Sequence, residues 1–300
     1  MKIVRIVALL ACSAVCFLVL GQEDYAFRVL ANKGSNEVKS GDAWRPLKTG
    51  AQLKLGDELK ISENASVGLV SKTGKPLEVK EAKIYKIAEL IGKVGNEASV
   101  LNKYTSFILS SNSAEARKNR LSATGAVHRG LDDISVQLPE SGHSDVLNNI
   151  VIVRWHSKKF TGPFVVTLKD RFDEELWKTE TSENFVEIDL SAPKLAKEFS
   201  IALEVAVKAD PKSKSEQHYL KRLDAKKSEN IKAELSKVSA DLQEETAFNK
   251  YLLASVYEEN KLLIDAITCY EQAIKMDAEN PTYKESYDEF LLRNKIKTDK

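Results

Sequence analysis

Apolar and polar residues alternate with a period of two in two separate stretches of this 300-residue chain. In the first stretch, about 25–87, the alternation is carried by residues 53–55, 59–61, 67–69 and 77–79, with Gly-Asp and Thr-Gly-Lys-Pro turn sequences between the runs. Because successive side chains of a strand point to opposite faces, each run predicts a short β-strand with one face on a core and the other in water. Several such strands separated by turns predict a small β-barrel or sandwich.

The second alternating stretch covers about 146–208 and is rich in β-branched and aromatic residues. Its apolar runs are 150–155, 164–168, 186–190 and 201–207. They predict a second β domain, and Trp155 at the end of an early strand makes it similar in architecture to an immunoglobulin- or fibronectin-type sandwich. No cysteine lies in this stretch, which excludes the disulfide-bonded antibody type. The resemblance implies a spacing or adhesion module.

The remaining segments predict helices. Residues 98–109 have apolar side chains near helical spacing, which predicts a helix beside the first β domain, followed by an extended connection at 121–129. The polar residues 211–215 predict a hinge, after which we expect no further strand. Residues 220–242 predict one or two amphipathic helices. The predicted fold class is multidomain α+β, with a β module and its associated helix, a β-sandwich and a helical region at 22–130, 146–208 and 212–300.

The first 21 residues have the three-part pattern of a secretory signal peptide: a basic start, an apolar run and the small residue Gly21. We expect cleavage between Gly21 and Gln22, because the apolar run is shorter than the ~20 residues that span a bilayer. The alternatives are an uncleaved signal anchor and a lipoprotein cut before Cys12 or Cys16. The sequence predicts export to the periplasm or the outer cell envelope, with no stable membrane span after signal removal.

Signal removal takes away two basic residues and two of the three cysteines. The mature chain then has 43 basic and 44 acidic residues, a net charge of −1, and Cys269 as its one thiol. Proteins that bind nucleic acid normally carry a basic excess, so this class is excluded. One thiol forms no intramolecular disulfide, and we expect Cys269 to be a small buried residue of a helix.

Residues 44–61 read Trp-Arg-Pro-Leu-Lys-Thr-Gly-Ala-Gln-Leu-Lys-Leu-Gly-Asp-Glu-Leu-Lys-Ile and resemble the core motif of FecR-like domains. A Trp, a Leu-x-x-Gly, a Leu-x-x-Gly-Asp and an apolar strand follow one another in that family. The resemblance covers about 27–79, and it implies an extracytoplasmic β module. We expect no cytoplasmic anti-sigma segment of the kind found in iron-signalling members. The residues themselves predict that Trp44 belongs to the core and that Gly50 and Gly56 are turn positions with positive φ.

Residues 247–278 are similar to a tetratricopeptide repeat, a pair of antiparallel helices. The residues that carry the likeness are Leu253, Ala254 and Tyr257 in the first helix and Ala266, Tyr270 and Ala273 in the second. Repeats of this kind need neighbours to cover them, and we expect the helices before 247 and at 283–293 to do so. The resemblance implies docking of a partner peptide or protein on the first helix.

By family position, the partner-binding residues on that helix would be Phe248, Tyr251, Ser255 and Glu258. The alternative is that Phe248 and Tyr251 simply pack against the helix at 235–242. The partner itself is an unidentified envelope protein or peptide segment.

The sequence contains no catalytic, cofactor or metal-binding motif that we recognise. Its histidines, which lack the spacing of metal ligands, are His128, His143, His156 and His218. There is no Gly-x-Ser-x-Gly elbow and no Gly-rich loop between a strand and a helix. We expect a protein that is not an enzyme and that binds no cofactor, although a site assembled from distant residues would escape such a search.

Three functions fit these observations. The first is a non-enzymatic interaction or scaffold protein of the bacterial cell envelope. The second is an envelope signal sensor that uses the FecR-like module. The third is a cell-wall or glycan-binding protein, which would use exposed aromatic residues such as Trp44 or Trp177.

Overall fold

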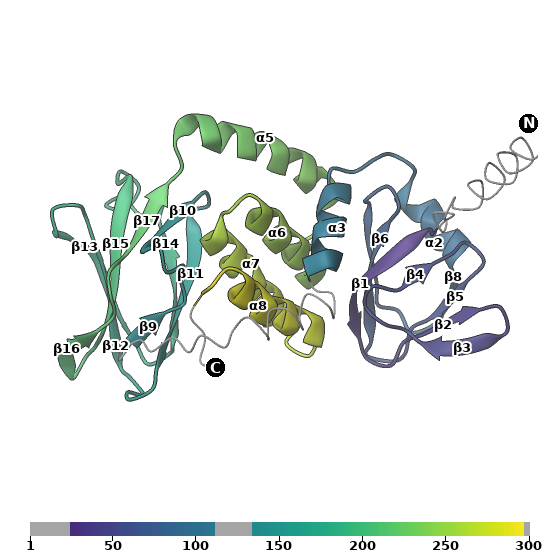
Figure 1. Cartoon of the computed structure of the whole chain (residues 1–300), viewed down its shortest axis with the longest axis horizontal. Helices are drawn as coiled ribbons and strands as arrows, with labels where there is room; N and C mark the ends of the chain where they lie inside the picture. Colours follow the sequence, from purple (N-terminus) through teal and green to yellow (C-terminus); the bar gives the residue numbers. More distant parts are fainter. Residues whose placement is uncertain (1–24, 112–133, 297–300) are drawn as a thin grey trace, which may run out of the picture.

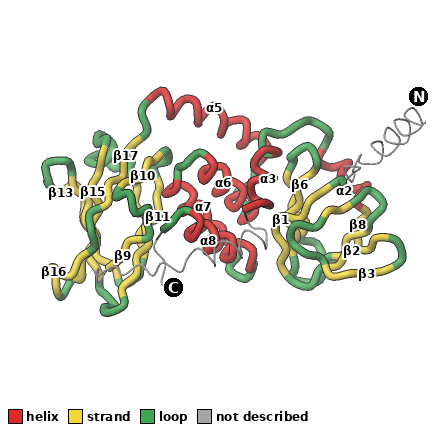
Figure 2. The backbone as a smooth tube through the Cα atoms, in the orientation of Figure 1, coloured by secondary structure: helices red, strands yellow, loops and turns green. Residues whose placement is uncertain are grey.

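A computed structural model describes residues 25–111 and 134–296 of the chain. Three units lie in a row in Figure 1: a β unit from the N-terminal part of the sequence, a bundle of helices, and a second β unit. Figure 2 shows the same arrangement by element type, with the helices between two ends rich in strands. The chain is therefore a mixed protein of antiparallel sheets followed by a C-terminal helical region, as the coarse fold class predicts.

The N-terminal β unit consists of two four-stranded sheets followed by a short helix. One sheet has the order β4-β1-β6-β7, and the other has the order β3-β2-β5-β8. The elements are β1 (Phe27–Lys33), β2 (Glu37–Ser40), β3 (Ala43–Pro46), β4 (Gln52–Leu53), β5 (Glu58–Lys60), β6 (Ser66–Ser71), β7 (Pro76–Val79), β8 (Ile84–Lys86) and α2 (Ile87–Val94). All strand pairs are antiparallel, which agrees with the short alternating runs and tight turns of the sequence.

Strand β6, in the interior of the first sheet of this unit, is buried on both faces. Phe27, Val29 and Leu69 point into the core between the two sheets, whereas Leu30 and Val70 belong to the core shared with the helices. Every residue of β6 is buried. The expectation of a water-exposed second face is therefore wrong for β6, because helices from elsewhere in the chain cover it.

The second β unit also contains two sheets. The elements are β9 (Ile134–Val136), β10 (His143–Val146), β11 (Ile150–Ser157), β12 (Phe164–Lys169), β13 (Glu175–Thr181), β14 (Phe185–Asp189), β15 (Ser200–Val207), β16 (Asp210–Lys214) and β17 (His218–Arg222). The larger sheet has the order β10-β17-β15-β12-β13, with β16 paired to β15, and the smaller has the order β14-β11-β9. Trp155 of the smaller sheet meets Phe164 of the larger one edge to face, with ring centroids 5.6 Å apart, so the sheets share one core.

Strands continue beyond the predicted limits of this unit. The segment 211–215, expected to be a hinge, forms most of β16, and β17 then pairs in parallel with β10. Ser215 explains why so polar a segment is ordered: its backbone N–H donates to the carbonyl of Val205 at 2.8 Å, and its hydroxyl accepts from the N–H of Val205 at 3.1 Å. Polar side chains are tolerated because β16 lies at an edge, where one side faces water.

The helical region begins at residue 225, after β17. It contains α5 (Ala225–Asp241), α6 (Ala247–Glu259), α7 (Leu263–Met276) and α8 (Pro281–Arg293), and α3 (Asn102–Ser111) from earlier in the chain packs on α6. Asp224, Thr246 and Asn280 begin three of these helices as N-caps whose side chains accept a backbone N–H. The helix expected near 98–109 is thus present as α3, a few residues further on.

The helices lie between the two β units and contact both. α6 lies against β6 and α8 lies against β1 of the N-terminal β unit, while α7 packs along β11 of the second β unit. The long helix α5 runs along one side from the second β unit toward the N-terminal one (Figure 1). The two β units are therefore joined through a common helical core.

Two predicted features lie outside the described residues. The signal peptide at 1–21, with its cleavage site at Gly21 and Gln22, is one, and the connection at 121–129 with His128 is the other. None of the described helices has the length and apolar character needed to cross a membrane.

Candidate binding sites

The four residues assigned to partner docking by sequence are close together on α6 but are not at the surface. Phe248, Tyr251, Ser255 and Glu258 are between 0% and 2% exposed. Phe248 lies on Gly68 of β6, and the Tyr251 ring contacts the rings of Tyr270 and Tyr283. A partner segment therefore has no access to these side chains, because the chain's own N-terminal β unit and helices α7 and α8 occupy the face where a peptide would bind. The described contact of Phe248 is with β6, and the helix at 235–242, the alternative partner, contributes Val238 and Leu242 to the same core.

Glu258 is held by residues at the end of α8. Arg293 donates two hydrogen bonds to its carboxylate, at 2.8 and 2.7 Å, and the Asn294 side chain donates a third at 2.8 Å. Burial lowers the pKa of the Arg293 guanidinium, but the hydrogen bonds and the charge of Glu258 raise that pKa by more, so the guanidinium stays charged. Glu258 therefore fixes α8 on α6 and does not serve as an external ligand.

A stripe of polar residues on α7 attaches the helical region to the second β unit. Asp265 accepts the backbone N–H groups of Leu147 and Asn148 at 3.0 and 2.9 Å, in the turn between β10 and β11. Thr268 accepts the N–H of Ile152 at 2.9 Å, three residues further along the helix. The spacing of three residues places these side chains on one face of α7, directly against β11.

Glu271 continues this stripe by another three residues. Its carboxylate accepts two hydrogen bonds from the Arg154 guanidinium, both at 2.8 Å. The hydrogen bonds to Glu271 raise the pKa of Arg154 more than burial lowers it. The sequence analysis did not identify this stripe, although acidic and hydroxyl residues at a spacing of three on an otherwise apolar helix are a recognisable signal.

Asp265 is fully buried, and burial is the main influence on its ionisation. Desolvation raises the pKa of its carboxyl to about 6, against the opposing effect of the backbone N–H groups of Leu147 and Asn148. No cationic side chain hydrogen-bonds to it among the described contacts. Asp265 thus acts as a cap for the β10–β11 turn from a different unit of the chain.

The aromatic residues considered for glycan binding are placed differently. Trp44 is half-buried on the edge strand β3, with the Lys60 ammonium 5.8 Å from its ring centroid, so it is not the core residue that we expected. Trp177 pairs with Leu168 across β12 and β13 and packs against the core of the second β unit. Both side chains are half-buried.

The turn at Gly56 and Asp57 is stabilised by side-chain hydrogen bonds. The buried Asp57 accepts the N–H of Lys54 at 2.8 Å through one oxygen and the Ser40 hydroxyl at 2.7 Å through the other. Gly50 has a positive φ of 88°, as expected, whereas Gly56 does not adopt positive φ. Asp57, which closes the turn by side-chain hydrogen bonds, makes a left-handed residue at Gly56 unnecessary.

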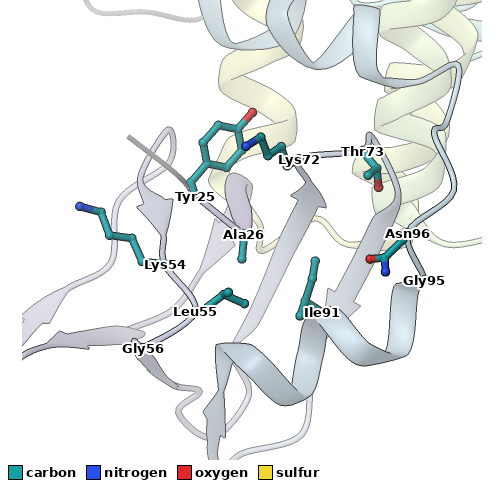
Figure 3. A pocket seen from close by; sticks show the side chains of 10 residues that line it. All are labelled: Tyr25, Ala26, Lys54, Leu55, Gly56, Lys72, Thr73, Ile91, Gly95 and Asn96. Atoms are coloured by element: carbon teal, nitrogen blue, oxygen red, sulfur yellow. The ribbon is translucent and has the colours of Figure 1, made fainter. Parts of the chain in front are cut away.

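Leu55 at the tip of this turn lines a surface pocket with a volume of about 450 Å³. The alternation of 53–55 predicted a buried Leu55, but β4 ends at Leu53 and Leu55 is 57% exposed. Figure 3 shows Leu55 and Ile91 on two sides of the space, with loop residues around them. The other lining residues are Tyr25, Ala26, Lys54, Gly56, Lys72, Thr73, Gly95 and Asn96.

A smaller pocket of about 170 Å³ lies at the β10 end of the second β unit. Ser144 lines it, and the Ser144 hydroxyl lies 2.9 Å from Nε2 of His218. This geometry is compatible with a nucleophile and its base, but burial, with a smaller effect of His143, lowers the pKa of His218 to about 4. An imidazole of that pKa is a weak base, and both side chains are buried, so we assign the pair to the core.

The remaining titratable groups suggest no reactive or metal site. Within residues 25–111 and 134–296, no three His, Cys, Asp or Glu side chains are grouped closely enough to hold a metal ion. Cys269 is buried on α7, as predicted, and desolvation raises the pKa of its thiol to about 12. Such a thiol is unreactive at neutral pH.

No protein-family model matches this chain, and no curated protein matches it either.

Proposed function

We propose that this chain is an exported, non-enzymatic interaction protein of the bacterial cell envelope. In this proposal an FecR-like module and an immunoglobulin- or fibronectin-like sandwich are held at a fixed spacing by a tetratricopeptide-like helical region. The observation that carries the proposal is the position of the helical region, whose opposite sides are both used for contacts within the chain.

The contacts on each side combine apolar packing with polar pairs. Toward the N-terminal β unit, Leu30 and Val70 pack with the helices, and the Lys33 ammonium pairs with Asp277 at 2.8 Å and with Glu279 at 3.1 Å. Toward the second β unit, the stripe from Asp265 to Glu271 is added to the packing of α7 on β11. Domains of one chain move relative to each other unless their interface is large and apolar, so a shared core favours a rigid spacer.

A rigid arrangement of this kind favours a role as a scaffold over a role in which the helical repeat binds peptides. The residues that would receive a peptide are buried, so recognition of a partner falls to the free surfaces of the two β units. The pocket beside Leu55 is one of these surfaces.

The fixed spacing is tested by measuring the distance between spin labels on the two β units. Labels at Lys48→Cys and Lys212→Cys, both exposed positions, report on the N-terminal and second β units in a chain that starts at Gln22. We expect one narrow distance distribution, as narrow as that of a control pair within one unit, Lys48→Cys with Lys83→Cys. A broad distribution for the first pair alone would show independent units and contradict the scaffold.

Export is tested by cell fractionation and N-terminal sequencing of the full-length chain. We expect the extracytoplasmic fraction to contain a form that starts at Gln22. A cytoplasmic form that keeps residues 1–21 would contradict the location, and a form that starts at Cys12 or Cys16 would indicate a lipoprotein.

The pocket of the N-terminal β unit favours one alternative, in which the chain senses a ligand and signals through the envelope. A sensor needs a change of state on binding, whereas a scaffold does not. The spin-label pair above distinguishes them: a ligand that shifts the distance between the β units supports sensing, and an unchanged distance supports the scaffold.

A further inference from the structure

The strand β13 is the last strand of the larger sheet of the second β unit. It pairs with β12 on one side, and on its other side the described part of the chain supplies no strand. Figure 1 shows β13 on the outer side of this unit, at the end of the molecule opposite the N-terminal β unit. An edge strand leaves a row of backbone N–H and C=O groups that can pair with a strand of another chain. The strand has seven residues and contains no proline, so its whole length is able to pair.

Hydrogen bonds elsewhere in the sheet show which residues of β13 are bonded to β12. The N–H of Lys208, directly after β15, donates to the carbonyl of Pro163, directly before β12, at 2.9 Å. The backbone groups of successive strand residues point alternately to the two neighbouring strands, so the odd-numbered residues of β12 point toward β15 and the even-numbered ones toward β13. Val166 therefore turns its N–H and C=O toward β13, where it lies opposite Thr179.

The same alternation assigns the rest of β13. Thr179, and with it Trp177 and Thr181, direct their backbone groups to β12, because the pairing of the two strands has no register shift over these residues. Lys178 and Glu180 direct their N–H and C=O groups to the outer side. The open edge of the sheet thus presents the backbone groups of one basic and one acidic residue.

The charges distinguish among the registers in which β13 could pair with β13 of a second copy. A symmetric antiparallel pair has a twofold axis at one residue, and residues that point outward must face each other. An axis at Lys178 or at Glu180 would place like charges directly opposite, and an axis at Trp177 would place Glu180 opposite Glu174. An axis at Thr179 places Lys178 of each copy opposite Glu180 of the other. Opposite charges stabilise a strand pair and like charges destabilise it, so the register centred on Thr179 is favoured.

The other face of the sheet fits the same register. Thr179 would lie opposite Thr179 of the second copy, and Trp177 opposite Thr181. These are pairs without backbone hydrogen bonds between them, in which side chains approach each other most closely. Trp177 packs on the core of its own unit and is half-buried, so the second copy would cover its open side.

The ion pairs within the single chain do not prevent this pairing. The Lys178 ammonium lies 3.7 Å from the Glu175 carboxylate, and Glu180 pairs with Lys208. All four side chains are about half exposed, and exposed ion pairs contribute little to stability. A carboxylate has two acceptor oxygens, so Glu180 can keep Lys208 of its own chain and also accept Lys178 of the second copy.

We propose that two copies of this chain pair through β13, antiparallel and centred on Thr179, so that their larger sheets become one continuous sheet. The edge strand β14 of the smaller sheet lacks this complementarity, because its two charged residues, Glu187 and Asp189, are both acidic. The proposal goes beyond the scaffold role and does not depend on it, since β13 lies away from the helical region. A strand pair of this length buries little surface, so we expect a weak dimer that depends on concentration.

The test measures the mass of the chain that starts at Gln22 by analytical ultracentrifugation, at concentrations from about 5 to 200 µM. We expect the wild type to change from monomer to dimer over this range. Lys178→Glu and Glu180→Lys each place like charges opposite in the dimer, and we expect each to raise the dissociation constant at least about tenfold.

An equal mixture of these two variants tests the register itself. In a mixed pair, position 178 of each chain again faces the opposite charge at position 180 of the other chain. We expect the mixture to dimerise within about threefold of the wild type although each variant alone does not, which would also show that both variants are folded. The control variants Lys194→Glu and Glu63→Lys reverse exposed charges outside β13, and each should stay within about twofold of the wild type.

A wild type that stays monomeric at every concentration would overturn the proposal and show that the charges of β13 protect a free edge. A dimer that both charge variants retain, or a mixture that does not recover dimerisation, would overturn it as well. The spin-label distance between the two β units is measured in the Lys178→Glu chain, so that failure of the dimer and failure of the fixed spacing are separate results.

Discussion

Phe248 on α6 lies directly on the backbone of Gly68 on β6: a β-carbon added at Gly68 would come within 2.4 Å of Cε2 of the phenyl ring. The contact joins residues 180 positions apart and holds the helical region against the N-terminal β unit. A glycine in the interior of a strand otherwise weakens it, so the close approach of this ring explains why the position has no side chain.

We predict that Gly68→Ala destabilises the protein by about 1–3 kcal/mol, the range for overpacking a close-packed contact. The added methyl group collides with a ring that has no space to move, because Phe248 is almost fully buried. Urea unfolding measures the change. The matched variant Gly92→Ala, on α2 with open space around the position, should instead be neutral or stabilising by up to about 1 kcal/mol. Equal effects of the two substitutions would contradict the contact.

The Glu258 carboxylate is the second point where α6 is fixed to another helix. Glu258→Gln keeps the shape of the side chain but removes its charge and turns an amide N–H₂ toward the donors of Arg293. Removing one partner of a buried ion pair leaves the other uncompensated, and we expect a loss of about 3 kcal/mol in the free energy of unfolding. The exposed neighbour Glu259→Gln is the control and should change stability by less than about 0.5 kcal/mol. A small effect at Glu258 would show that Arg293 finds another partner.

Asp265 makes stability depend on pH in an unusual direction for a carboxylate. Its pKa is about 6 in the folded chain and near the ordinary value of 3.8 in the unfolded chain, so the folded state binds more protons between these values. Stability contributed by this group is therefore highest below pH 4 and falls, by about 3 kcal/mol in total, as pH rises through 6. Asp265→Asn removes this titration. When unfolding is measured from pH 4 to 7, the free energy of unfolding of the wild type minus that of the variant should fall as the pH rises. A difference that stays constant over this range would contradict the assignment.

His218 acts in the opposite direction over the same range. Its pKa is about 4 when folded, against an ordinary value of 6.5, so the unfolded state binds more protons and stability falls as pH drops from 6.5 toward 4. The two buried groups therefore offset each other in the wild type. We expect His218→Gln to lose stability as pH rises through this range, and Asp265→Asn to lose stability as pH falls. Parallel profiles for the two variants would contradict the opposing pKa shifts.

Cys269 is the one thiol of a chain that begins at Gln22, which allows a direct test of its burial. A thiol whose pKa is raised from 9.0 to about 12 has roughly a thousandfold smaller thiolate fraction at neutral pH. We expect an aromatic disulfide reagent to react with the native protein far more slowly than with the protein unfolded in guanidinium chloride. Lys48→Cys adds an exposed thiol as the positive control, and this thiol should react fast in the native protein. If Cys269 in the native protein reacts as fast as the added thiol, Cys269 is accessible and the prediction is contradicted.

The local elements of this fold could be predicted from sequence because each is marked by its neighbours in the chain. Period-two runs around Val67 and Ile188 became strands, and Thr246 and Asn280 mark helix starts by side chains that cap the first turn. The segment at Asp210–Lys214 was missed because its strand is stabilised by hydrogen bonds to β15, and not by any apolar pattern of its own.

The candidate sites were less accessible to the same reasoning. Phe248 and Tyr251 have the residue types of a docking face, but whether such a face is free depends on what packs against it. Leu55 looked like a strand residue, since the end of β4 at Leu53 is decided by the hydrogen bonds of Asp57 across the turn. Asp265 is an ordinary helix acid until β10 and β11 bring two backbone N–H groups to it.

The sequence by itself determined the alternating strands, the turns, the helix caps and the burial of Cys269, because these depend on side-chain spacing and local hydrogen bonds over a few residues. Only the tertiary structure decided that β6 and β11 are buried on both faces and that the expected docking face of α6 is covered. The physical reason is that apolar faces are interchangeable partners: periodicity shows that a face must be buried, but not which distant segment buries it.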